Sequence, residues 1–206
     1  MGSATYNVFL NVPYDKSYEN QFVALVAAIV CYGCTPRCAL EVPDDSHGRL
    51  KKIVGLLKRC EASVHDLSYV RLRREKFRVP RFNMPFEAGI AYRVASERNG
   101  KHRKHQVFLL EAVAGRLHES LSDLDGISPQ IHRGTCKGTL AAVADCLARR
   151  EPVSLVDMEA VRRKLAQKVE ILKDEESATT VFTTRLFRPM VVMATELAAR
   201  KKVIRY

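Results

Sequence analysis

The sequence predicts an α/β domain in which a parallel sheet is covered by helices on both faces. Short apolar segments of strand length alternate along the chain with longer segments that space apolar residues at helical intervals. Such alternation is typical of βαβ units, whose parallel strands are joined by right-handed crossovers. The composition, 47% hydrophobic and 28% charged, excludes a disordered, collagen-like or disulfide-scaffold chain. We therefore expect a flavodoxin-like or Rossmann-like domain.

The expected elements follow from apolar spacing and from the residues that end each segment. Pro13 ends the first strand, and Gly33 follows the first helix as a stop signal. Strands are expected at residues 6–12, 35–40, 62–65 and 106–110 and around Ile131. Helices are expected at residues 18–32, 50–60, 85–95 and 139–149.

The C-terminal part of the chain contains helical patterns without further strands. One amphipathic helix is expected over residues 158–172 and another over 191–203, beginning after Pro189, with a polar linker at 173–180. The sequence thus divides into an α/β domain at residues 5–150 and a helical extension at 151–206. The extension has three alternative roles: to cap the domain, to pair with another copy or to dock a second protein.

Charge, cysteines and hydropathy limit the partners. The formal net charge is +11, and residues 71–105 contain eleven basic and three acidic residues. Such a window attracts phosphate groups. A solvated loop, however, explains most of these side chains, and few aromatic residues accompany them for stacking on nucleic acid.

Cys31, Cys34 and Cys38 lack a second cluster at zinc-ligand spacing, so we expect no metal site. No apolar run reaches the roughly 18 residues of a membrane span and no signal peptide is recognisable, so a cytoplasmic protein without membrane contact is expected.

Polar residues follow the first and third expected strands. In a parallel sheet of order 2-1-3-4-5, ligands bind between these strands, where the strand order reverses. Asn11 and Asp66 lie at the two strand ends, and Glu87 lies near the start of the next helix. We expect these three residues to surround one cleft. The chain has no Gly-x-Gly-x-x-Gly or Walker-type loop, which argues against classical hydride transfer and P-loop chemistry.

Glu87 is the candidate catalytic residue. Asn83 can cap its helix and Pro85 suits the first turn, so the helix dipole is expected to favour the ionised carboxylate. A carboxylate facing a ribose C1′ can stabilise an oxocarbenium-like transition state or form a glycosyl intermediate. Asp66 can bind the ribose hydroxyls. The alternative is structural, since acids in a first helical turn and an Asp after a strand are both common.

Three segments together carry a family resemblance. The chain resembles the TIR-like branch of nucleotide glycosidases and is similar to nucleoside 2-deoxyribosyltransferases over roughly residues 6–149. The segments are Tyr-Asn-Val-Phe-Leu-Asn-Val-Pro at 6–13, Val-His-Asp-Leu-Ser at 64–68 and Pro-Phe-Glu-Ala-Gly-Ile-Ala at 85–91. The chain departs from both groups: it has no tryptophan ahead of the glutamate, and Asn-Met at 83–84 replaces a small pair.

The resemblance implies roles for four residues. Glu87 matches the catalytic glutamate and Asp66 the sugar-binding acid, while Asn11 and Pro13 match the loop that closes over the ligand. The expected activity is N-glycosidic cleavage of NAD or a related nucleotide, as in bacterial defence effectors. NAD is then the substrate and no other cofactor is required.

The remaining ligand contacts are assigned by chemistry. A pyrophosphate needs a positively charged side chain, and a base needs an aromatic surface. Separately, the helices of residues 151–206 are expected to bind another copy of the chain or a sensor protein. Base exchange by a deoxyribosyltransferase, and nucleotide sensing without turnover, are the alternative functions. The further ligand-binding candidates are Tyr14, Arg81, Asn83 and Phe86.

Overall fold

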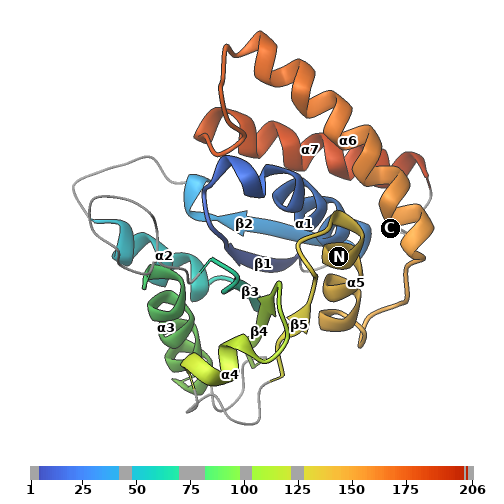
Figure 1. Cartoon of the computed structure of the whole chain (residues 1–206). Coiled ribbons are helices and arrows are strands. Elements are labelled where there is room, and N and C mark those ends of the chain that lie inside the picture. The colour runs from blue at the N-terminus through green and yellow to red at the C-terminus, as the bar shows by residue number, and fades with distance from the viewer. Residues whose placement is uncertain are drawn as a thin grey trace.

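A five-stranded parallel sheet forms the centre of the computed structural model, which describes residues 5–41, 48–69, 82–97, 104–121, 128–201 and 203. The strand order is β2-β1-β3-β4-β5, and every neighbouring pair is parallel (Figure 1). This confirms the flavodoxin-like fold class. The strands are β1 (Tyr6–Asn11), β2 (Cys34–Cys38), β3 (Ala62–Asp66), β4 (Gln106–Glu111) and β5 (Gln130–Ile131).

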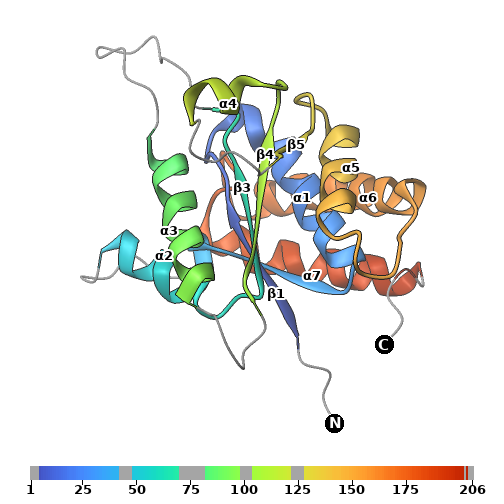
Figure 2. The same ribbon diagram turned by 90° about the horizontal axis from the view of Figure 1, so that it is seen from below.

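Helices cover both faces of the sheet. Figure 2 shows α2 and α3 on one side and α1, α5, α6 and α7 on the other. The α-helices are α1 (Glu19–Cys31), α2 (Arg49–Leu57), α3 (Asn83–Glu97), α4 (Arg116–Ser120), α5 (Cys136–Cys146), α6 (Leu155–Glu175) and α7 (Thr184–Arg200). Two 3-10 turns, η1 (Lys16–Tyr18) and η2 (Ala39–Glu41), precede α1 and follow β2.

Alternation along the strands divides the core into clusters on the two faces. On β1, Val8 and Leu10 belong to the large cluster that includes α1, whereas Phe9 packs with Ile53 and Leu57 of α2. Successive side chains of a strand point to opposite faces. The last residues of each strand alternate between the two faces in the same way, so this alternation determines which polar side chains at the strand ends lie on the same face.

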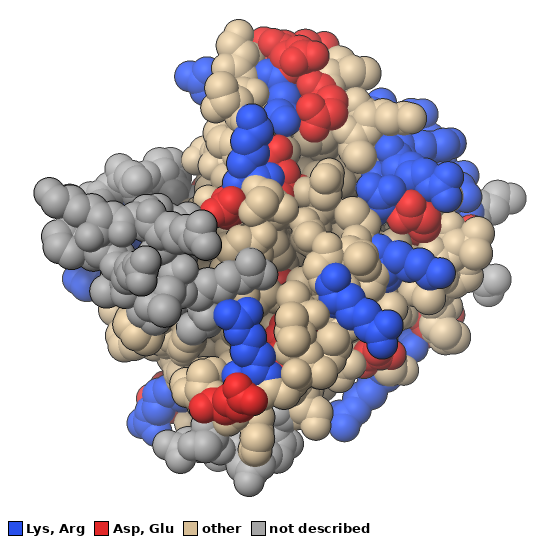
Figure 3. Space-filling model, in the orientation of Figure 1, with Lys and Arg blue, Asp and Glu red and all other residues tan. Residues whose placement is uncertain are grey.

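The extension forms part of the main core. Residues 22–31 of α1 are all buried, because the sheet covers one side of this helix and α6 and α7 cover the other. A helix that is apolar all round requires such enclosure. Outside this contact α6 is mostly charged or polar, with Leu155, Val156 and Ile171 exposed as well. Figure 3 shows Lys and Arg side chains gathered over part of this helix.

The second extension helix begins earlier than the sequence predicted. It starts at Thr184 and contains Pro189, whereas the prediction placed its start after this proline. The Thr183 side chain accepts a hydrogen bond from the Leu186 backbone N–H (3.2 Å), which caps the helix. Burial of Leu186 and Phe187 then holds the first turns in place, despite the hydrogen bond that Pro189 removes. Likewise α6 continues to Glu175, so the start of the expected linker is helical.

Leu165 of α6 provides a test of this shared core. Leu165 is fully buried, so Leu165→Ala is expected to lower the free energy of unfolding by about 2–5 kcal/mol through lost burial and a residual cavity. The control is Val156→Ala, at a position that is 78% exposed, with an expected change within about 0.5 kcal/mol. Urea unfolding followed by far-UV and near-UV circular dichroism measures both variants. Two separate transitions would contradict a single core.

Candidate active site

The candidate site lies where β1 and β3 end side by side. Asn11 pairs in register with His65, and β1 lies between β2 and β3, so the strand order reverses here. In open α/β sheets this edge is the usual ligand position. The sequence predicted both the strand order and this location.

Glu87 is a buried carboxyl group beside one exposed arginine. The residue is 5% exposed, and its Oε1 lies 3.8 Å from the Nε of Arg49, the first residue of α2. Burial raises the pKa of Glu87, and the positive charge of Arg49 partly offsets that increase. Desolvation combined with a specific charged partner is typical of functional carboxyl groups. Arg49 was not among the residues that the sequence singled out.

The helix that carries Glu87 starts two residues before the expected position 85, so Asn83 is not its cap. Asn83 is itself the first residue of α3, and the Phe82 carbonyl accepts the first helical hydrogen bond from Phe86 N (3.0 Å). Glu87 therefore lies in the second turn, where the helix dipole acts weakly. The dipole does not determine its ionisation; burial dominates and acts in the opposite direction.

Tyr14 links Glu87's arginine to the C-terminal extension. The Arg49 guanidinium lies 5.3 Å from the centroid of the Tyr14 ring, and this ring stacks on Phe182 at 5.2 Å. Burial raises the pKa of Tyr14 well above its usual value, and the Cys38 side chain adds to that increase. Phe182, in the loop between α6 and α7, thus stacks on the Tyr14 ring, where a nucleotide base was expected to stack. No sequence pattern marked Phe182 for this position.

Asn11 fixes the start of α3 through a buried chain of hydrogen bonds. Its Nδ2 donates to the Met84 carbonyl (3.3 Å) and to Nδ1 of His65 (2.9 Å). The chain continues from His65 Nε2 through the Ser63 hydroxyl to His105 Nε2, each step 2.9 Å. Nδ1 of His105 ends the chain by donating to the Cys60 carbonyl (2.9 Å), since a carbonyl can only accept. Nε2 of His105 therefore accepts from the Ser63 hydroxyl, and that hydroxyl accepts from Nε2 of His65. Nδ1 of His65 is left to accept from Asn11.

His65 is expected to make the fold sensitive to acid. Burial lowers the pKa of His65 to about 3, so the folded chain holds this ring neutral where the unfolded chain, with a pKa near 6.5, becomes protonated. Stability is therefore lost as the pH falls below about 6.5, by about 1.4 kcal/mol per pH unit from this ring alone. Urea unfolding at pH 7, 6 and 5 is expected to show a shallower slope for His65→Gln than for the parent. The exposed His118→Gln is the control; an equally altered slope there would contradict this assignment.

Asp66 lies in a separate buried network. Its side chain accepts hydrogen bonds from the Tyr18 hydroxyl and the Ser68 backbone N–H (2.9 Å), and its Oδ2 lies 3.1 Å from Nε2 of His132. Asp66 is fully buried and follows His65, so it points to the α1 side of the sheet, whereas Asn11 and His65 point to the α3 side. The structure therefore brings Asn11 and Glu87 to the same face of the sheet but places Asp66 on the other.

Ser68, His132 and Asp66 do not form a nucleophilic triad. The Gly134 backbone N–H donates to Nδ1 of His132 (3.1 Å), so the ring proton lies on Nε2. This same Nε2 faces both the Ser68 hydroxyl (2.8 Å) and Asp66. A protonated nitrogen cannot take the serine proton, so the network ties β3 to the start of α1 and to the loop before α5.

The other predicted ligand contacts are scattered. Pro13 is buried, whereas Asn83 and Phe86 are exposed on α3. Arg81, the expected pyrophosphate partner, lies outside the described residues, as do most of the basic residues of the 71–105 window, at positions within 71–81 and 98–103.

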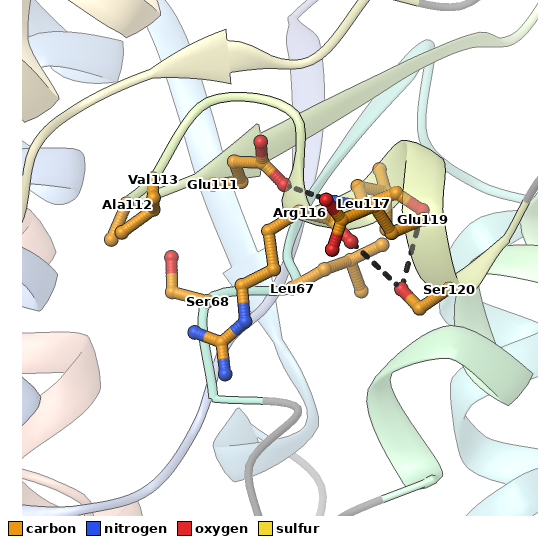
Figure 4. A pocket seen from close by; sticks show the side chains of 9 residues that line it. All are labelled: Leu67, Ser68, Glu111, Ala112, Val113, Arg116, Leu117, Glu119 and Ser120. Atoms are coloured by element: carbon orange, nitrogen blue, oxygen red, sulfur yellow. Dashed lines mark hydrogen bonds between the residues drawn. The ribbon is translucent and has the colours of Figure 1, made fainter.

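A cavity of about 300 Å³ opens at the ends of β3 and β4, and no predicted site residue lines it (Figure 4). Glu111 is buried here: its Oε2 accepts from the Leu117 backbone N–H (2.8 Å), but its Oε1 has no hydrogen-bond partner among the described residues. Leaving such an oxygen unsatisfied costs about 1–3 kcal/mol. The lining residues are Leu67, Ser68, Glu111, Ala112, Val113, Arg116, Leu117, Glu119 and Ser120.

No family model and no curated protein matches the chain. Across the described ranges, no three His, Cys, Asp or Glu side chains are grouped as metal ligands would be, and the cysteines there are free thiols. None of the helices in the same ranges combines the length and the apolar character that crossing a membrane requires.

Proposed function

We propose that the protein is an N-glycosidase that cleaves the bond between ribose and base in NAD or a related nucleotide, with Glu87 facing C1′. The observation that carries this proposal is the Glu87 carboxyl group itself, buried beside Arg49 at the edge where the strand order reverses. The resemblance of residues 85–91 to a glycosidase helix adds support.

The chemistry requires little more than one carboxylate. As the C1′–N bond breaks, its electron pair goes to the base; nicotinamide, cationic in NAD, leaves neutral and needs no proton. Water then adds to C1′ and releases a proton. The ribose ring becomes positively charged in the transition state, so a desolvated carboxylate interacts with it more strongly than with the ground state.

The neighbours of Glu87 have positioning roles in this proposal. Asn11 anchors the start of α3 by its bond to the Met84 carbonyl, which sets the carboxylate position. Arg49 favours the ionised form of Glu87 and is half-exposed, within reach of a phosphate. Because Asp66 is buried in its own network, the proposal assigns it no contact with the ribose.

The test is incubation of the purified chain with NAD, followed by chromatography for nicotinamide and ADP-ribose. Both products are expected in equal amounts. Transfer of ribose or deoxyribose to an added free base, without hydrolysis, would instead identify a transferase. A rise in melting temperature with NAD but no product would identify a nucleotide-binding module, because a ligand of the native state stabilises it.

The pH profile is expected to report Glu87. The ionised form is required, so kcat/KM is expected to fall on the acid side with a midpoint above 4.5, the ordinary value from which burial raises this pKa. Arg49→Gln is expected to move that midpoint to still higher pH, because Arg49 lowers the pKa. Lys51→Gln, an exposed position on the same helix, is the control. A midpoint unaffected by Arg49→Gln would contradict the assignment.

A further inference from the structure

We propose that Phe182, in the loop between α6 and α7, is a positioning residue for Glu87 that acts through Tyr14 and Arg49. The loop holds the Tyr14 ring, the ring holds the Arg49 guanidinium, and the guanidinium lies beside the Glu87 carboxyl group. This role rests on the proposed function, in which Glu87 is the reacting carboxylate. It makes the C-terminal extension part of the machinery that sets the state of that carboxylate.

The loop is fixed to the start of α1. The Val181 backbone N–H donates to Oε1 of Glu19 (3.2 Å), and Nζ of Lys173 lies 3.3 Å from the other oxygen of the same carboxylate. Val181 is buried, and the side chains of Glu19 and Lys173 are both largely buried. Solvent and salt screen such a covered ion pair less than an exposed one. The backbone directly before Phe182 therefore has a defined position relative to α1.

The Phe182 ring connects the core to Tyr14. Its centroid lies 5.1 Å from that of Phe22 and 5.2 Å from that of Tyr14. Phe22 is fully buried on α1 and gives the Phe182 ring a rigid support. Aromatic rings at these separations attract one another in addition to the effect of burial. Phe182 thus restricts the orientations that the Tyr14 ring can take.

Tyr14 in turn restricts Arg49. The Arg49 guanidinium lies 5.3 Å from the centroid of the Tyr14 ring, within the range of a cation–π contact. The Arg49 side chain is 51% exposed, and its Nε lies 3.8 Å from Oε1 of Glu87. A long, half-exposed side chain loses much rotamer freedom when it is held in one place. The ring therefore favours the rotamers that keep the guanidinium beside Glu87.

Arg49 is the charge on which the ionisation of Glu87 depends. Burial raises the pKa of Glu87, and Arg49 lowers it. Among the described residues, Tyr14 and His65 are the other titratable groups on this side of Glu87, and both are neutral near pH 7. Burial raises the pKa of Tyr14 well above its usual value and lowers that of His65 to about 3. A change that frees Arg49 is therefore expected to raise the pKa of Glu87.

The test is the pKa of Glu87 in the full-length chain, read by NMR from its side-chain carboxyl carbon over a pH titration. The resonance is assigned by its absence in Glu87→Gln. Phe182→Leu is compared with Phe187→Leu: both parent rings contact Phe22, at 5.1 and 5.9 Å, but Phe182 also stacks on Tyr14. Phe182→Leu is expected to raise the pKa of Glu87, and Phe187→Leu to leave it unchanged. No rise in Phe182→Leu, or equal rises in both variants, would overturn the proposal.

The double variant Phe182→Leu/Arg49→Gln tests the route. If Phe182 acts through Arg49, the double variant has the same Glu87 pKa as Arg49→Gln alone, because the charge that Phe182 positions is already gone. Additive shifts would contradict this route. Should Phe182→Leu fail to fold, the parent chain still decides: nuclear Overhauser effects from the Tyr14 ring to both Phe182 and Arg49 are expected, and their absence would overturn the proposal.

The outcome is separable from that of the glycosidase proposal, because the Glu87 resonance is measured without NAD. A pKa shift in Phe182→Leu together with a parent chain that does not cleave NAD would support the coupling and contradict the activity. Cleavage of NAD with an unchanged Glu87 pKa in Phe182→Leu would do the reverse.

Discussion

Replacing Glu87 with glutamine is expected to lower nicotinamide release from NAD by about a thousandfold or more. The amide has the shape of the carboxyl group but carries no charge, so it can neither stabilise the cationic ribose ring nor attack C1′. Removing one charge-stabilising or proton-transfer group from an active site typically has effects of about 10²- to 10⁴-fold. Single-turnover chromatography of nicotinamide, at NAD concentrations above KM, separates this loss from weaker binding.

The same variant is expected to fold at least as stably as the parent. The pKa of Glu87 is raised in the folded state, so at neutral pH its ionised form works against folding, and glutamine removes that penalty. The free energy of unfolding at pH 7 is therefore expected to be unchanged or higher by about 1 kcal/mol, as is common where function and stability compete.

Glu97→Gln is the matched control for Glu87→Gln. Glu97 lies on the same helix, is exposed and pairs with Arg93 at 3.1 Å, so its loss costs about 0.5 kcal/mol or less and leaves activity intact. An inactive but unfolded Glu87→Gln chain would be explained by stability alone. A folded Glu87→Gln chain with parental turnover would end the glycosidase proposal.

Asp66→Ala is expected to destabilise the fold by about 3–5 kcal/mol. The Tyr18 hydroxyl and the Ser68 backbone N–H lose their acceptor, His132 loses a carboxylate neighbour at 3.1 Å, and all of these residues are buried. Breaking such a buried network by removing one partner is costly, since the others remain unsatisfied. Urea unfolding at pH 7 measures the effect.

Two further variants test whether the loss of stability in Asp66→Ala comes from its buried hydrogen bonds. Asp66→Asn keeps an acceptor oxygen and is expected to lose roughly half as much stability, while Asp174→Ala, at an exposed position on α6, is expected to change it by less than about 0.5 kcal/mol. The sequence alone favoured a sugar-binding role for Asp66. An Asp66→Ala chain of unchanged stability and raised KM would restore that role.

Local pattern predicted the sheet, because strand and helix periodicities are properties of neighbouring residues. The order of β1 and β3, and hence the edge that holds Glu87, followed from topology. The alternation of β3 also implied that His65 and Asp66 face opposite sides, so the separation of Asp66 from Glu87 was accessible from the sequence.

The sequence pattern did not predict which side chains contact each of these polar groups. Arg49, Phe182 and His132 reach Glu87, Tyr14 and Asp66 from distant parts of the chain. Nothing in their local sequence specifies these contacts, which arise only when the helices pack. The unsatisfied oxygen of Glu111 likewise depends on the shape of the loop that follows β4.

The enclosure of α1 has a consequence for biosynthesis. This helix is made before α6 and α7, which cover its surface opposite the sheet. Until α6 and α7 have been made, a nascent chain exposes an apolar helix, the kind of intermediate that aggregates or recruits chaperones. We therefore expect the folding yield to depend on how quickly α6 and α7 are translated.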